Sequence, residues 1–163
     1  MNAGKQFEQD FKNSIPTNTY YYRLRDGTAG WGEQEKTRFQ AKNICDAILY
    51  RYPHMHLLEL KSTKGKSIPL SRLTQYKDMV KAQSKGLFVG FIFNMRDVNE
   101  TYYVLIDDIT HFMQSESRKS LPIDFMREHG IIIGQELKRT RWRYNVAEWL
   151  DRLENKRCTN QAK

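Results

Sequence analysis

The 163-residue sequence is poor in cysteine and proline and has no long hydrophobic run, and these absences exclude several classes of protein. Its two cysteines, Cys45 and Cys158, are too few for a disulfide framework and do not form a CxxC-type zinc site. The longest apolar run, Leu87 to Phe93, is far shorter than the roughly 18 to 20 residues of a membrane-spanning helix. No apolar stretch follows a basic N-terminal end, so no secretory signal is expected. We therefore expect a cytoplasmic protein with no membrane partner.

Acidic residues are scarce relative to basic ones. The sequence has 27 Lys and Arg against 19 Asp and Glu, a formal net charge of +8. Much of this excess lies between Lys61 and Lys85, where seven basic residues accompany one acid, and a second basic stretch, residues 138–144, interleaves cations with aromatics. A localised positive field favours a polyanion such as nucleic acid, and a solvated helix face is the alternative.

The length and the 39% hydrophobic content suit one domain, and we expect residues 1–163 to form it. Hydrophobic periodicity predicts helices over residues 4–15, 70–85, 107–117 and 145–156, and a further helix that begins near residue 122. Strands are predicted over residues 44–50, 55–61, 87–95, 101–106 and 130–134. This order indicates an α/β or α+β fold with a central sheet.

The two strands that flank Tyr52–Pro53 are predicted to pair as a hairpin. A turn centred on this dipeptide places Asp46 opposite Glu59, with the side chains about 5 Å apart on one face of the sheet. Lys61 lies two residues after Glu59 and therefore shares that face. A one-residue slip would move one strand's side chains to the other face, so the convergence of the three residues depends on this turn.

Two like charges in direct opposition are unfavourable in a sheet, so the pairing of Asp46 with Glu59 indicates a bound cation. Mg²⁺ suits such a site because it prefers oxygen ligands, and one or two carboxylates leave positions for water and phosphate. The ion would activate a water, and Lys61 could orient that water or hold the scissile phosphate. The chemistry implied is hydrolysis of a phosphodiester. The alternative is an exposed hairpin with incidental charges.

The Glu-x-Lys spacing is weak by itself because it occurs three times, at Glu59, Glu136 and Glu154. The copy at Glu154 lies on a predicted helix, where positions i and i+2 do not face each other. The copy at Glu136 has Asp124 upstream, but this acid sits at a predicted helix start, where aspartate is common.

Other reactive or aromatic groups have structural interpretations. His54 and His56 could ligate a metal, but more simply they decorate the hairpin. Cys45 is expected to pack in the sheet face opposite the acids, since no histidine is placed to activate it. Trp142 could stack on bases or pack in the core, and Trp149 is expected in the core or at an interface.

Asp46 followed by Glu59-Leu60-Lys61 on the next strand resembles the PD-(D/E)xK nuclease superfamily, and within it the RecU-type Holliday-junction resolvases, including phage-encoded forms. Cys45 stands where the superfamily name has proline. The resemblance implies an α/β, restriction-endonuclease-like core with a central mixed β-sheet flanked by helices. Further segments share the likeness: Gly4–Glu8, Ser62–Lys64, Ser67–Leu70, Gln75 and Gly130–Gly134.

The resemblance also implies roles for individual residues. Asp46 and Glu59 would ligate the metal together with the Leu60 carbonyl. Glu8 would complete the metal site from the first helix, Lys61 would orient the attacking water, and Gln75 would support the site. The cofactor would be Mg²⁺, with Mn²⁺ as a substitute. DNA would be contacted by Ser62, Thr63, Lys64, Lys66, Arg72, Arg25, Trp31 and Arg38.

RecU-type enzymes are homodimers that place two sites on a four-way DNA junction and nick two opposed strands. They project a stalk between the first helix and the motif strand, a place that residues 23–42 occupy here. The expected partner is therefore branched DNA, in the host cytoplasm if the protein is phage-encoded. Two alternatives stay open: a nuclease of the same superfamily with another DNA target, restriction-like or repair, and a non-catalytic basic domain that binds nucleic acid.

Overall fold

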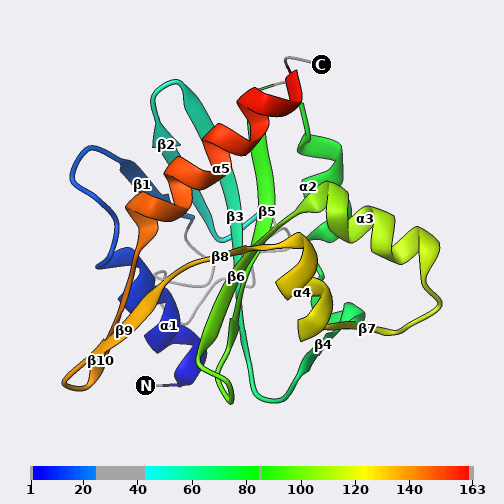
Figure 1. Ribbon diagram of the computed structural model, residues 1–163, viewed down its shortest axis with the longest axis horizontal. Helices are drawn as coiled ribbons and strands as arrows, with labels where there is room; N and C mark the ends of the chain where they lie inside the picture. The colour runs from blue at the N-terminus through cyan, green and yellow to red at the C-terminus, as the bar shows by residue number, and fades with distance from the viewer. Residues whose placement is uncertain (1, 25–42, 85, 162–163) are drawn as a thin grey trace, which may run out of the picture.

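The computed structural model describes residues 2–24, 43–84 and 86–161, with α-helices and β-strands arranged as in Figure 1. The helices are α1 (Ala3–Lys12), α2 (Tyr76–Ala82), α3 (Ile106–Ser115), α4 (Ile123–His129) and α5 (Val146–Gln161), with a 3₁₀ turn at Leu70–Arg72. The strands are β1 (Tyr20–Arg23), β2 (Ala47–Arg51), β3 (His54–Thr63), β4 (Ser67–Pro69), β5 (Leu87–Met95), β6 (Glu100–Leu105), β7 (Ser120–Pro122), β8 (Ile131–Ile132), β9 (Gln135–Lys138) and β10 (Arg141–Tyr144).

A mixed sheet of six strands forms the centre of the molecule, in the order β1-β2-β3-β5-β6-β8. β3 and β5 run parallel, and the other neighbours are antiparallel. Two small antiparallel pairs, β4 with β7 and β9 with β10, lie outside this sheet. The expected mixed α/β architecture with a central sheet is confirmed.

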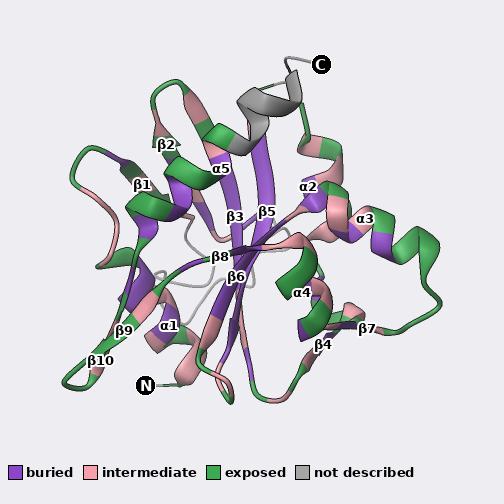
Figure 2. Cartoon of the chain, viewed as in Figure 1, coloured by how far each residue is buried: buried purple, intermediate pink, exposed green. Residues whose placement is uncertain are grey.

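Each face of the sheet carries its own hydrophobic core. One core joins residues of β3 and β5 to α2, α3 and α4, and the other joins residues of the same strands to α1 and α5. Leu57 belongs to the first core and Leu58 to the second, as the alternation of side chains along a strand requires. β3 and β5 are buried over most of their length because helices cover both faces (Figure 2).

The first helix begins one residue earlier and ends three residues earlier than the sequence predicts. It begins at Ala3 because the Asn2 side chain accepts a hydrogen bond from Lys5 N at 2.9 Å, a standard N-cap. It ends at Lys12, and beyond it the Ser14 hydroxyl donates to the Asp10 carbonyl at 2.7 Å. Pro16 also disfavours helical geometry at the residue before it. Phe7 and Phe11 are the buried apolar face of α1.

The single helix predicted over residues 70–85 is wrong. A 3₁₀ turn at Leu70–Arg72 is followed by a break at Leu73 (φ −85°, ψ 55°), and α2 starts only at Tyr76. Leu70 N is held by the Lys119 carbonyl at 2.9 Å, continuing the β4–β7 pairing, which fixes the chain before a helix can form. Helical periodicity does not report this constraint from a distant segment.

The remaining helices and strands lie close to the predicted positions, and β5 has the predicted bounds. The predictions missed β1, β4, β7 and the β9–β10 hairpin. None of the described helices is long and apolar enough to cross a bilayer.

Candidate active site

The β2–β3 hairpin has the register that the sequence predicts. Ala47 pairs with Leu58 and Tyr50 with Met55, so the turn is centred on Tyr52–Pro53. Asp46 lies just before β2, where its N–H donates to the Leu58 carbonyl at 3.0 Å. This bond carries the hairpin pairing one residue beyond the strand and brings Asp46 beside Glu59.

Glu59 is a buried acid, and only one of its two carboxylate oxygens accepts a hydrogen bond from the described residues. Its side chain has no exposed area, and its Oε1 accepts a hydrogen bond from Lys61 Nζ at 2.6 Å. Its Oε2 is buried and accepts no hydrogen bond from the described residues. Burial, and then the charge of Asp46, raise the pKa of Glu59 to about 7, while Lys61 lowers it. A cation at this point would hold the carboxylate ionised.

A backbone group of β3 adds to the same site. Leu60 N donates to Asp46 Oδ2 at 2.8 Å, and the Leu60 side chain packs in the core beneath α1 and α5. The N–H and C=O of one strand residue point to the same side, so the Leu60 carbonyl lies on the side of β3 that faces β2 and Asp46. Within the described part of the chain, no three His, Cys, Asp or Glu side chains form a metal-binding group. The two carboxylates and the carbonyl are oxygen donors of the kind that a hard ion prefers.

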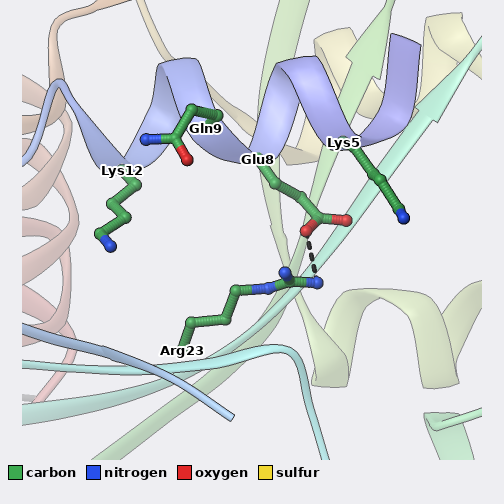
Figure 3. A pocket seen from close by; sticks show the side chains of 5 residues that line it. All are labelled: Lys5, Glu8, Gln9, Lys12 and Arg23. Carbon is green, nitrogen blue, oxygen red and sulfur yellow. Dashed lines mark ion pairs between the residues drawn. The ribbon is translucent and has the colours of Figure 1, made fainter. Parts of the chain in front are cut away.

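Glu8 lies on α1, which packs on the face of the sheet opposite the one that carries Glu59, and it is engaged by a cation. Glu8 Oε2 forms an ion pair of 2.5 Å with Arg23 Nη2 (Figure 3). Tyr21 lies on β1, two residues before Arg23. Its pKa is raised by burial and also by the charges of Asp46 and Glu8, while Arg23 lowers it. The predicted stalk began at Arg23, which is wrong because Arg23 is the last residue of β1. The run Tyr20–Tyr22 is typical of a strand and could have located β1.

The structure does not join Gln75 to the acid pair by a hydrogen bond among the described residues. Gln75 is the N-cap residue of α2, and its side-chain oxygen accepts from Thr74 Oγ1 at 2.5 Å. Its backbone carbonyl accepts from the N–H groups of Asp78 and Met79. Its role at the site therefore stays a prediction.

The predicted DNA contacts divide into internal and exposed groups. Ser62 Oγ donates to Asn94 Oδ1 at 3.0 Å, and the buried Thr63 hydroxyl accepts from Arg72 Nη1 at 3.1 Å. Both hydroxyls are therefore engaged in hydrogen bonds within the protein, at the C-terminal end of β3. Lys64, Lys66 and Arg72 are exposed and remain candidates for phosphate contacts. Arg25, Trp31, Arg38 and all but the first two residues of the predicted stalk lie outside the described residues.

Cys45 is buried, as expected, but on a different face from the predicted one. Its Sγ donates to the Ala47 carbonyl at 3.4 Å, and it packs in the core that contains Leu57 and Phe91, on the side of the sheet that carries Glu59. Strand alternation does not apply to it because it precedes β2. Burial raises the pKa of the thiol to about 11, which does not suit a nucleophile.

Packing shows where one of the two histidines and one of the two tryptophans lie. His56 is fully buried and stacks on Phe88, with ring centroids 4.8 Å apart. Trp149 is a core residue, 1% exposed.

The second Glu-x-Lys copy is a surface feature. Glu136 is exposed on β9 and pairs with Lys138 at 2.8 Å. Asp124 lies in the first turn of α4 and pairs with Arg127. This copy therefore lacks the buried acid pair of the first.

A comparison of the sequence with known protein families agrees with the geometry of this site. The model of the family Recombination protein U (RecU) matches residues 11–144. The chain belongs to the RecU family. RecU proteins are metal-dependent endonucleases that hydrolyse DNA phosphodiester bonds, and membership places this chain in that enzyme class. Asp46, Glu59, Lys61 and Gln75 lie inside the matched residues, and Glu8 precedes them.

Two relatives extend this comparison. The SPbeta prophage-derived uncharacterized protein YotM of Bacillus subtilis strain 168 is 27% identical over 171 residues, covering 93% of this chain and 85% of its own length. The structure of Hjc from Archaeoglobus fulgidus, a Holliday junction resolvase from an archaeal hyperthermophile, superposes with a TM-score of 0.53 at 14% identity. It covers 79% of this chain and 95% of Hjc. The RecU-family chain thus has a restriction-endonuclease-like fold.

Proposed function

We propose that this RecU-family chain is a Mg²⁺-dependent endodeoxyribonuclease that resolves four-way DNA junctions by paired nicks in opposed strands. The observation that carries the proposal is the convergence of Asp46, Glu59 and Lys61 at the end of the β2–β3 hairpin. The net charge of +8 supports a nucleic-acid substrate. The likeness to Hjc, described as a Holliday junction resolvase, supports the choice of a branched one.

The acid pair fits a hard divalent cation. Glu59 Oε2 is buried and accepts no hydrogen bond from the described residues, and burial, followed by the nearby charge of Asp46, raises the pKa of Glu59. Asp46, Glu59 and the Leu60 carbonyl would hold Mg²⁺, or Mn²⁺ in its place. Such an ion lowers the pKa of a bound water and offsets charge on a phosphoryl oxygen.

Lys61 would act on the nucleophile and on the site's geometry. Its ammonium donates to Glu59 Oε1 at 2.6 Å, which fixes the rotamer of the carboxylate. Its side chain is 17% exposed, so the ammonium can also donate to a water or to a phosphate oxygen of a bound strand. Asp46, fixed by Leu60 N, would keep its carboxylate in place without rearrangement during the reaction.

Cutting of a synthetic four-way junction tests the proposal. The wild-type protein with Mg²⁺ should give paired nicks, and Asp46→Asn should lower the cutting rate by about 10³-fold or more, the loss expected when a metal-centred site loses a ligand. Glu136→Gln is the matched control because it removes the acid of the exposed Glu-x-Lys copy, and it should cut like the wild type. Undiminished cutting by Asp46→Asn would overturn the proposal.

Substrate choice is tested separately. Linear duplex, flap and junction should be compared at equal salt, since electrostatic affinity alone does not discriminate among them. Preference for the junction supports a resolvase. Equal or faster cutting of the duplex or flap would instead assign the site to a restriction-like or repair nuclease, and binding without cutting in any divalent ion would indicate a non-catalytic domain.

A further inference from the structure

A pocket of about 350 Å³ lies between α1 and the edge strand β1, lined by Lys5, Glu8, Gln9, Lys12 and Arg23 (Figure 3). Lys5, Glu8 and Lys12 are spaced three and four residues apart and therefore share one face of α1. In Figure 3 the side chains of Lys5 and Lys12 extend on either side of the Glu8–Arg23 ion pair. Three cations against one carboxylate give the pocket a net charge of 3 − 1 = +2.

This pocket adjoins the acid pair through one strand. Arg23 pairs with Ala47 across β1 and β2, and Leu24 N donates to the Asp46 carbonyl at 2.9 Å. Neighbouring strands lie about 4.8 Å apart, so the β1 wall of the pocket is one strand spacing from the backbone of Asp46. Arg23 lies on the α1 face of the sheet and Glu59 on the opposite face, so a strand held at the pocket would reach the acid pair at the end of β2, where Asp46 precedes the strand.

We propose that this pocket is a binding site for the phosphate backbone of the DNA strand that enters the acid pair. The inference rests on the proposed function and extends the DNA contacts to Lys5, Lys12 and Arg23. Lys5 and Lys12 stand about 10 Å apart along the helix, a length that spans about two neighbouring phosphates of one DNA strand. Arg23 lies between them and presents a planar guanidinium, which suits bidentate contact with a phosphate.

The structure also explains why the pocket would hold phosphates rather than a small apolar ligand. Lys5 and Lys12 are exposed, and the Arg23 side chain is 45% exposed, so the cations face solvent where a strand can reach them. Glu8 holds Arg23 in place by the ion pair, and its side chain is only 21% exposed. The positive charge is therefore outermost and the negative charge lies beneath it.

The salt dependence of junction binding tests this inference without requiring cutting. Binding of a fluorescent four-way junction is measured by anisotropy in chelator over a range of salt for the wild type and for the double variant Lys5→Gln/Lys12→Gln. Two lost phosphate contacts should lower the slope of log affinity against log salt by about 1.8. At low salt the affinity should fall by about tenfold, and the thermal unfolding midpoint should not change.

The matched control is Arg118→Gln/Lys119→Gln, which removes two exposed charges between α3 and β7, on the side of the molecule away from α1 (Figure 1). It should leave the slope within about 0.5 of the wild type, since it removes long-range attraction without removing a contact. If both double variants change slope and affinity equally, the pocket is only part of a general positive field and the inference falls.

A single neutral phosphate maps the contact. A methylphosphonate moved along one junction strand should weaken wild-type binding at the positions that the pocket contacts. The same substitution should have no effect on Lys5→Gln/Lys12→Gln, because the partner charges are gone. Equal weakening of both proteins at every position would contradict the inference.

These readouts separate the inference from the proposed function. If the wild type never cuts a junction, but the slope of log affinity against log salt is lower in Lys5→Gln/Lys12→Gln, the phosphate site is supported and the nuclease activity is not. If the wild type cuts junctions and the double variant has the wild-type slope, the nuclease activity is supported and this site is not.

Discussion

The position of Asp46 beside Glu59 could be predicted from the sequence. The position of Asp46 relative to Glu59 follows from the turn at Tyr52–Pro53, since one register fixes every pair of the hairpin. Glu8 is different because its position depends on how α1 packs against the sheet. The Arg23 partner of Glu8 lies on a strand that the sequence analysis did not recognise. Local pairing was therefore predictable, and contacts between distant segments were not.

The raised pKa of Glu59 predicts an unusual pH dependence in the metal-free protein. Its pKa of about 7, against 4.5 in the unfolded chain, means that the folded state keeps a proton that the unfolded state releases between these values. The free energy of unfolding therefore falls as the pH rises through this window. From Glu59 alone we expect about 2 to 3 kcal/mol less stability at pH 8 than at pH 4. Urea denaturation in chelator measures it.

The comparison is made with Glu59→Gln, which cannot ionise. The other groups titrate in both proteins, so the difference in stability between them reports Glu59 alone. From pH 4 to pH 8 this difference should grow in favour of the variant. Adding Mg²⁺ at pH 8 should stabilise the wild type and leave Glu59→Gln unchanged. Parallel curves of stability against pH for the two proteins would contradict a raised pKa of Glu59 in the folded state.

At the scale of elements, the sequence predicted those with strong periodicity and missed those fixed by tertiary contacts. β5 was located to the residue because its apolar run is long and is bounded by Gly86 and by a polar turn. The β9–β10 hairpin has no glycine at its turn, where Arg139 adopts a positive φ of 58°, so no turn signal marks it. This hairpin is held instead by Asp10 of α1.

Asp10 gives a prediction about this hairpin. Its carboxylate is 1% exposed and accepts from Arg141 Nε at 2.5 Å and from Trp142 N at 3.2 Å. Arg141→Leu leaves the buried acid without its cation and should lower the free energy of unfolding by about 2 to 3 kcal/mol. Asp10→Asn keeps an acceptor oxygen for Trp142 N and should cost about 1 kcal/mol.

Urea denaturation of both variants at pH 7 measures the order of these effects. Arg143→Leu is the control because Arg143 is exposed on the same strand, and it should change stability by less than about 0.5 kcal/mol. A larger loss in Asp10→Asn than in Arg141→Leu would show that the carboxylate is not held by this pair.

At the scale of the whole molecule, the predicted central sheet and its flanking helices are present. The assembly was predicted from the family resemblance and from the symmetry of the junction. A four-way junction has two-fold symmetry, and two simultaneous cuts call for two related sites, which a homodimer provides. We propose this assembly for the RecU-family chain, with one acid pair in each subunit.

Mixed dimers test this assembly. Wild-type protein is co-refolded with an excess of Asp46→Asn, so that most active subunits have an inactive partner. Wild-type homodimers should linearise a cruciform plasmid by paired cuts, whereas mixed dimers should yield the nicked circle. The control is co-refolding with an excess of Glu136→Gln, which should preserve linearisation. Sedimentation of the wild type as a monomer, or unchanged linearisation in the Asp46→Asn mixture, would contradict the dimer.

The central claim is that Asp46 and Glu59 hold one divalent ion between them. Titration with Mn²⁺ at pH 8, followed by the electron paramagnetic resonance signal of the free ion, measures this directly. The wild type and Glu136→Gln should bind Mn²⁺ with the same affinity, and Asp46→Asn and Glu59→Gln should each lose at least tenfold. Equal Mn²⁺ affinity in all four proteins would contradict the claim.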